Sequence, residues 1–138
     1  MNPPLRSLLP VAVLAAAAIA CSDNEAPPTE DHTPVSYTIQ VNDLPVSEPY
    51  TFGSGTVRVR IKFFNAGQHD LDDVESSHFA GLTFEPASRA TAVRLADHHY
   101  QFDVTGGAPG AGTLQVSYGH DEQADEVTFE PAAITVSP

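Results

Sequence analysis

From Val35 onward, apolar and polar residues alternate along the chain. In the segment 35–42 every second residue is apolar, and the segment 56–64 repeats this pattern with Arg58, Arg60 and Lys62 at polar positions. A period of two places the apolar side chains on one face of a β-strand. The pattern predicts seven strands, at 35–42, 56–64, 79–84, 91–95, 100–104, 113–118 and 127–136.

Turn residues separate these segments. Gly-Ser-Gly at 53–55 and Gly-Gly-Ala-Pro-Gly at 106–110 lie between predicted strands, and no stretch of the domain repeats its apolar residues with the helical period of 3.6. Short strands at this spacing are typical of a sandwich. We therefore predict an all-β fold for a single domain that covers residues 35–138, a length close to the commonest domain size.

One stretch resembles a known family. The residues YQFDVTGGAPGAGTLQVSY at 100–118, followed by Ile-Thr-Val at 134–136, are similar to the closing half of bacterial immunoglobulin-like domains, in which two strands flank a glycine-rich turn. The resemblance implies an immunoglobulin-like β-sandwich of about seven strands. In that topology the loops at 65–78, 96–99 and 119–126 gather at one end.

The first 20 residues have the features of a bacterial signal peptide. Arg6 precedes an apolar run from Leu8 to Ala20, which is too short to cross a bilayer comfortably and is expected to be helical. The sequence Ala-Ile-Ala-Cys at 18–21 resembles a lipobox, which implies cleavage before Cys21 and acylation of its thiol. Cys21 is the only cysteine, so an intramolecular disulfide is impossible. The alternative is an ordinary signal peptide followed by a cysteine that is not acylated.

Residues 21–34 connect this cysteine to the domain. The segment is acidic, contains three prolines and has no periodic apolar residues, which predicts a disordered tether. Ser22 follows the cysteine where Asp would favour retention in the inner membrane of Gram-negative bacteria. We therefore predict a protein of the cell envelope, held by its lipid at the periplasmic face of the outer membrane or on the cell surface.

Charge limits the classes of partner. The formal net charge is −12, and all 18 acidic residues follow Cys21. This charge repels nucleic acid and attracts cations. Five of the six histidines lie in or beside the three loops predicted to share one end: His69, His78, His98, His99 and His120. The acidic residues of the same end are Asp70, Asp72, Asp73, Glu75, Asp97, Asp121, Glu122, Asp125 and Glu126.

Imidazoles and carboxylates from several loops are ligands that suit Zn²⁺, Cu²⁺ or Ni²⁺. The predicted ligands are one histidine from each loop, with Asp97 or Asp121 as a fourth ligand or as an orienting partner; the three histidines are His78, His99 and His120. His98 is the rival of His99. Two alternatives remain open at this point: loops that are merely solvated, and a calcium site built from carboxylates alone.

No arrangement of nucleophile and base is recognisable in the sequence, so we predict that the protein is not an enzyme. The leading function is a module that binds a divalent transition metal. The alternative is a non-catalytic adhesion or assembly module that binds a protein partner in the envelope. Arg58, Arg60 and Lys62 form a basic stripe for which ion pairing across to the strand at 100–104, through Asp103, is the expected explanation.

Overall fold

The computed structural model describes residues 32–71 and 77–138, which contain ten strands and no helix. The predicted signal peptide, Cys21 and the tether up to residue 31 lie outside these residues. No helix within the described ranges has the length and apolar character needed to cross a membrane. The strands are β1 (Ser36–Val41), β2 (Leu44–Val46), β3 (Tyr50–Phe52), β4 (Thr56–Phe64), β5 (Phe79–Glu85), β6 (Ala90–Leu95), β7 (His98–Gly106), β8 (Gly110–Gly119), β9 (Val127–Thr128) and β10 (Ala132–Val136).

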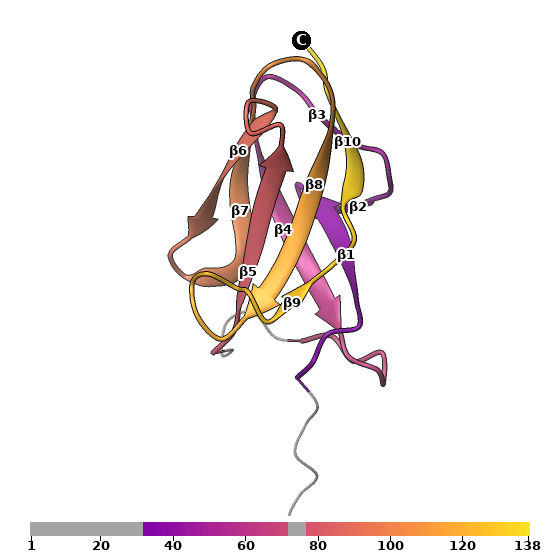
Figure 1. Cartoon of the computed structure of the whole chain (residues 1–138), viewed down its shortest axis with the longest axis vertical. Coiled ribbons are helices and arrows are strands. Elements are labelled where there is room, and N and C mark those ends of the chain that lie inside the picture. The colour runs from indigo at the N-terminus through magenta and orange to yellow at the C-terminus, as the bar shows by residue number, and fades with distance from the viewer. Residues whose placement is uncertain (1–31, 72–76) are drawn as a thin grey trace, which may run out of the picture.

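The strands form two sheets that face each other (Figure 1). The first sheet has the order β2-β1-β4-β7-β6, and the second has the order β3-β10-β8-β5, with β9 paired to β8. All pairs are antiparallel except β3 with β10. Apart from the short β2, β3 and β9, this is the strand order of an immunoglobulin-type sandwich. The predicted fold class is confirmed.

Three differences from the predicted strands affect the topology or the site. β2 and β3 were not predicted, because three residues are too few to show a period. The last predicted strand, 127–136, is broken into β9 and β10 around Pro131, which has no backbone N–H to donate to a ladder. β7 begins at His98, two residues earlier than predicted, so His98 and His99 belong to a strand and only residues 96–97 form the turn before it.

The buried faces of both sheets meet in one core. Phe63 of β4 is fully buried and lies between the sheets, with its ring 5.0 Å from the rings of both Tyr100 and Tyr118 at edge-on angles. Edge-to-face contacts of this kind add to the stabilisation that burial provides. The core residues come from the alternating positions that the sequence marks as apolar, among them Ile39, Val59, Ile61, Phe102, Val104, Leu114, Val116, Ile134 and Val136.

The basic stripe is accounted for by ion pairs. Arg58 lies opposite Asp103 in the β4–β7 register, and its Nε donates to the Asp103 carboxylate at 2.7 Å, so the predicted pairing of these two residues is confirmed. Lys62 pairs with Asp70 at the end of β4. Such exposed pairs contribute about 1 kcal/mol or less to stability. The stripe therefore has a structural explanation and needs no binding function.

Candidate metal site

The registers of three neighbouring strands bring His78, His120 and Glu126 together. Phe79 of β5 pairs with Gly119 of β8, and Tyr118 of β8 pairs with Val127 of β9. The three side chains are adjacent to these pairs: His78 precedes Phe79, His120 follows Gly119 and Glu126 precedes Val127. The Glu126 N–H donates to the Tyr118 carbonyl at 3.0 Å and closes the β8–β9 loop beside His120. Strand pairing alone thus places the three residues at the same end of the second sheet.

Alternation of side chains decides which way two of them point. His120 follows Tyr118 by two positions, and His78 precedes Ala80 by two, so both histidines continue faces that are buried farther along their strands. His78 is only 8% exposed and stacks on Tyr118, with ring centroids 4.8 Å apart and planes at 12°. The side chain of His120 is 63% exposed. The cluster therefore closes the open end of the core, with His78 inside and His120 at the rim.

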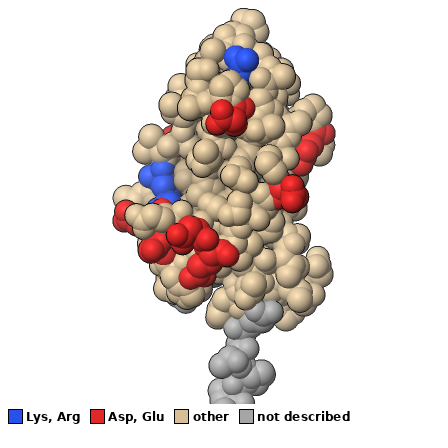
Figure 2. Space-filling model, in the orientation of Figure 1, with Lys and Arg blue, Asp and Glu red and all other residues tan. Residues whose placement is uncertain are grey.

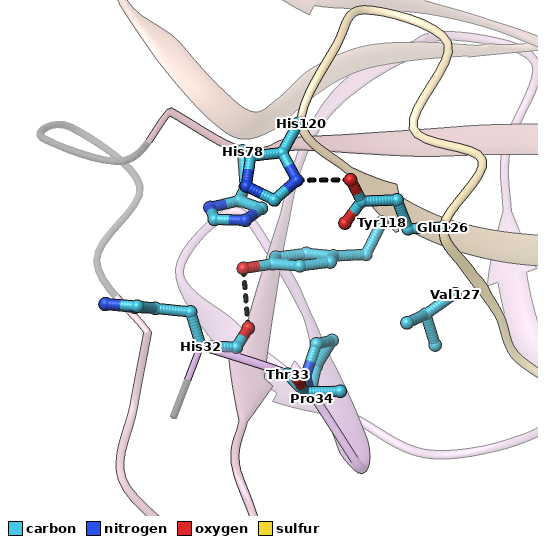
Figure 3. Close-up of a pocket in the computed structure, with 8 residues that line it drawn as sticks. All are labelled: His32, Thr33, Pro34, His78, Tyr118, His120, Glu126 and Val127. Atoms are coloured by element: carbon cyan, nitrogen blue, oxygen red, sulfur yellow. Dashed lines mark hydrogen bonds and ion pairs between the residues drawn. The ribbon is translucent and has the colours of Figure 1, made fainter. Parts of the chain in front are cut away.

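The three side chains are close enough to share one ion. Each offers one ligand atom, an imidazole nitrogen or a carboxylate oxygen, and these atoms all lie within 4.8 Å of one another. The rings of His78 and His120 have centroids 3.9 Å apart, and His120 Nδ1 is hydrogen bonded to the carboxylate of Glu126 (Figure 3). A divalent ion needs ligands about 2.0–2.2 Å from its centre, so the side chains would have to move closer together to bind one ion.

The cluster lines a pocket of about 250 Å³. The chain segment that leads to β1 forms the other side of this pocket (Figure 3). There the Tyr118 hydroxyl donates to the backbone carbonyl of His32 at 2.8 Å. The lining residues are His32, Thr33, Pro34, His78, Tyr118, His120, Glu126 and Val127.

The electrostatics of the cluster favour a cation. Burial lowers the pKa of His78, and the neighbouring His120 and His32 lower it further, against an opposing effect of Glu126. The hydrogen bond from His120 lowers the pKa of Glu126. At neutral pH His78 is therefore an uncharged imidazole and Glu126 an ionised carboxylate, the protonation states in which both residues bind metals.

Arg94 holds the loop that carries His120 and Glu126. Its guanidinium crosses from β6 to the second sheet, where Nη2 donates to the carbonyls of Ala80 and Glu122, each at 2.8 Å. The same group lies 5.0 Å from the centre of the Phe79 ring. Acidic side chains gather over this β8–β9 loop (Figure 2), and they add to the negative potential around the cluster.

Of the residues predicted as ligands, the structure brings His78 and His120 together. The other three are not members of the group. His99 Nδ1 is hydrogen bonded to the carbonyl of His78 at 3.1 Å, and its ring stacks on Phe79 at 4.2 Å. Asp121 Oδ1 accepts from the N–H of Gln123 at 3.1 Å within the loop, and Asp97 is exposed in the turn before β7.

Sequence reasoning did not select Glu126 or His32. Glu126 stood among nine acidic residues of the same end, and only the β8–β9 pairing distinguishes it from Asp121, Glu122 and Asp125. His32 was assigned to the tether. The alternation of apolar residues could have guided the choice among the predicted ligands. His78 and His120 each lie two residues from a buried apolar position of the neighbouring strand, whereas His99 and Asp97 do not.

Comparisons with known proteins identify neither a family nor a function for this chain. No family model matches the sequence, and no curated protein matches it. Among solved structures, the chain is similar to the crystal structure of domains 4 and 5 of the S-layer protein SbsC, with a TM-score of 0.45 and 18% sequence identity. The similarity covers 77% of this chain and 54% of that one, so the chain spans about half the length of that structure. A likeness of this size indicates neither a shared family nor a shared function.

Proposed function

We propose that this β-sandwich binds a divalent transition metal ion, Zn²⁺ or alternatively Cu²⁺ or Ni²⁺, through His78, His120 and Glu126. One observation carries the proposal: two imidazoles and a carboxylate, supplied by three adjacent strand ends, have their ligand atoms within 4.8 Å of one another. Mixed nitrogen and oxygen ligands in this number suit Zn²⁺, which is commonly held by three or four such groups. Soft sulfur ligands are not part of the cluster, which disfavours Cu⁺.

In the metal-free protein, a proton occupies the position between two of these ligands. The low pKa of Glu126 makes its carboxylate the acceptor, so His120 Nδ1–H is the donor. An ion that binds Nδ1 of His120 and the carboxylate would take the place of this proton, which the neutral ring would then carry on Nε2. His78 also binds as a neutral imidazole, the form that its burial favours.

The site is assigned a binding role rather than a catalytic one. The side chains that complete the pocket include Pro34, Tyr118 and Val127. Burial raises the pKa of Tyr118 far above neutrality, which removes its hydroxyl as a nucleophile or general base.

Anchoring through Cys21 remains part of the proposal and rests on the sequence. His32, the first described residue, lies beside the cluster. The 11 residues from Cys21 to this point span at most roughly 40 Å, so an acylated protein would hold the metal site at the end nearest the membrane. Mass spectrometry of the membrane fraction should find acyl chains on Cys21, and a Cys21→Ser variant should leave that fraction. An unmodified Cys21 would contradict the anchor.

The adhesion or assembly alternative has weaker support. Leu44 on β2 and Val93 on β6 are each 68% exposed. These strands are the two opposite edges of the first sheet, so the exposed side chains do not form one apolar patch. Isolated apolar residues are common on protein surfaces.

The decisive experiment is thermal unfolding of the purified full chain with a chelator and with Zn²⁺, Cu²⁺, Ni²⁺ or Ca²⁺ added. An ion present at 100 times its Kd stabilises the folded state by about 2.7 kcal/mol, which should raise the midpoint by roughly 10 °C in a domain of this size. His120→Gln and Glu126→Gln change exposed side chains, so both variants should fold and lose most of the response.

Substitutions of residues outside the cluster provide matched controls. His69→Gln and Glu130→Gln change exposed residues outside the cluster and should respond to Zn²⁺ like the unchanged protein. His99→Gln and Asp97→Asn test the other residues predicted from the sequence, and the geometry leads us to expect that both retain the response. If no transition metal shifts the midpoint, the metal site does not exist; if Ca²⁺ alone does, the carboxylates bind without the histidines.

A further inference from the structure

We propose that His32 supplies a third imidazole to this site, so that metal binding fastens the leading segment, residues 32–34, to the end of the sandwich. The inference rests on the proposed metal function and adds to it a ligand and a consequence. The ring of His32 stacks beside that of His78, with centroids 6.0 Å apart and planes at 25°. Two histidines distant in sequence thus meet at the wall of one pocket (Figure 3).

The backbone of the leading segment is already held in place. The Tyr118 hydroxyl donates to the His32 carbonyl at 2.8 Å, Pro34 is buried, and the Val35 N–H donates to the Phe64 carbonyl at 2.8 Å. These contacts fix the Cα of His32 at the rim of the pocket without using its imidazole. A ligand whose backbone is positioned before the ion arrives loses less conformational entropy on binding.

The imidazole itself can turn toward the ion. His32 is exposed, so rotation about its Cα–Cβ and Cβ–Cγ bonds meets little resistance. In the present rotamer His32 is not one of the three residues whose ligand atoms lie within 4.8 Å of one another. Its rotation would complete a set of three imidazoles and one carboxylate, which fills the four positions that Zn²⁺ prefers and leaves none open.

Such a closed site has a mechanical consequence. With His78, His120 and Glu126 as the only ligands, the ion would link strand ends that the sheet already joins. With His32 added, the ion also links the sandwich to the chain that precedes it. This link would reinforce the backbone contacts that already hold residues 32–35, so the leading segment would detach from the sandwich less often when metal is bound. The site would then act as a metal-dependent clamp rather than as a store for ions.

The test measures Zn²⁺ affinity of the full chain by competition with a chromophoric chelator, in the unchanged protein and in His32→Gln, His120→Gln and His69→Gln. Loss of an orienting partner outside the ligand set typically costs 10- to 100-fold in metal affinity, so loss of His32 as a ligand should cost at least roughly tenfold. The His69→Gln control should bind as the unchanged protein does. Hydrogen exchange of the backbone at residues 32–36 should slow when Zn²⁺ is added to the unchanged protein, and should not respond in His32→Gln.

The outcomes separate the two proposals. If His120→Gln loses binding while His32→Gln keeps full affinity and exchange still slows equally in both forms, the metal site stands and the clamp is wrong. If the unchanged protein does not bind Zn²⁺, the proposed function fails and the clamp fails with it. The clamp would also be wrong if His32→Gln binds Zn²⁺ more weakly but Zn²⁺ does not slow hydrogen exchange at residues 32–36 in the unchanged protein.

Discussion

The two ends of the sandwich use their polar side chains differently. At the end that carries the β7–β8 turn, Arg89 donates to three backbone carbonyls: those of Ala108, Pro109 and Ala111, at 3.1, 2.7 and 2.8 Å. At the opposite end, where residue 32 leads into the domain (Figure 1), two imidazoles and a carboxylate face one another around a pocket. At the first end the charged group is hydrogen bonded to the backbone, whereas at the second end ionisable side chains lie next to one another.

The difference teaches what distinguishes a structural polar group from a candidate site. A guanidinium that is hydrogen bonded to carbonyls stabilises a turn and leaves little capacity for a ligand. At the other end, burial and the neighbouring His120 and His32 lower the pKa of His78, which favours the neutral imidazole that a metal ion binds. The polarity of a loop does not by itself distinguish a structural polar group from a candidate site, because the loops at both ends are polar.

The largest expected effect on the free energy of unfolding comes from a substitution at the end of the sandwich that lacks the His78, His120 and Glu126 cluster. A Cβ on Gly106 would lie 2.0 Å from the carbonyl oxygen of Gly53, so Gly106→Ala forces β7 away from the loop between β3 and β4 and should lower the free energy of unfolding by about 3 kcal/mol. Gly55→Ala, where a Cβ meets nothing within 4 Å, is the control. Urea unfolding measures both. If the metal response of Gly106→Ala is also lost, the two ends are not independent.

A smaller effect is expected from Arg94→Met, which leaves the carbonyls of Ala80 and Glu122 without their donor. The free energy of unfolding should fall by about 1–2 kcal/mol. Zn²⁺ affinity should fall too, because the β8–β9 loop loses its attachment to β6. Arg89→Met is the matched comparison: it should destabilise the protein to a similar extent and leave Zn²⁺ affinity unchanged. Equal loss of affinity in both variants would contradict a positioning role specific to Arg94.

The smallest expected effect is a change in the pH dependence of stability. Burial and His120 lower the pKa of His78 in the folded protein, so the unfolded chain binds a proton more readily than the folded one does. The stabilisation from neutral His78 is fully present above the unfolded pKa of about 6.5 and is lost as pH falls from there through the folded pKa. His78→Phe, which preserves a ring against Tyr118, should flatten this slope in metal-free protein. The slope should persist in His69→Gln; a slope unchanged in His78→Phe would assign it to another group.

The candidate site was predictable only in part. Histidines on loops expected at one end pointed to the end of the molecule where the candidate site lies, and His78 and His120 are the pair that meets there. The choice of His99 depended on placing it in a loop, whereas β7 begins at His98 and directs the His99 ring onto Phe79. Asp121 was predicted as a ligand and Glu126 was not, although both lie in the loop at 119–126. They differ in the structure because Glu126 is held next to His120 by the β8–β9 pairing, while Asp121 accepts a hydrogen bond inside its own loop.

Alternation of apolar residues was sufficient for the all-β class, the single core and the pairing of Arg58 with Asp103, because a period of two is a local property that each strand carries in its own residues. Register is not local. Whether His78 meets His120, whether Glu126 closes on them and whether His32 reaches their pocket depend on how strands far apart in the sequence align, and a shift of one residue would send each side chain to the opposite face. Tertiary pairing therefore decided the site, whereas the sequence had already decided the scaffold.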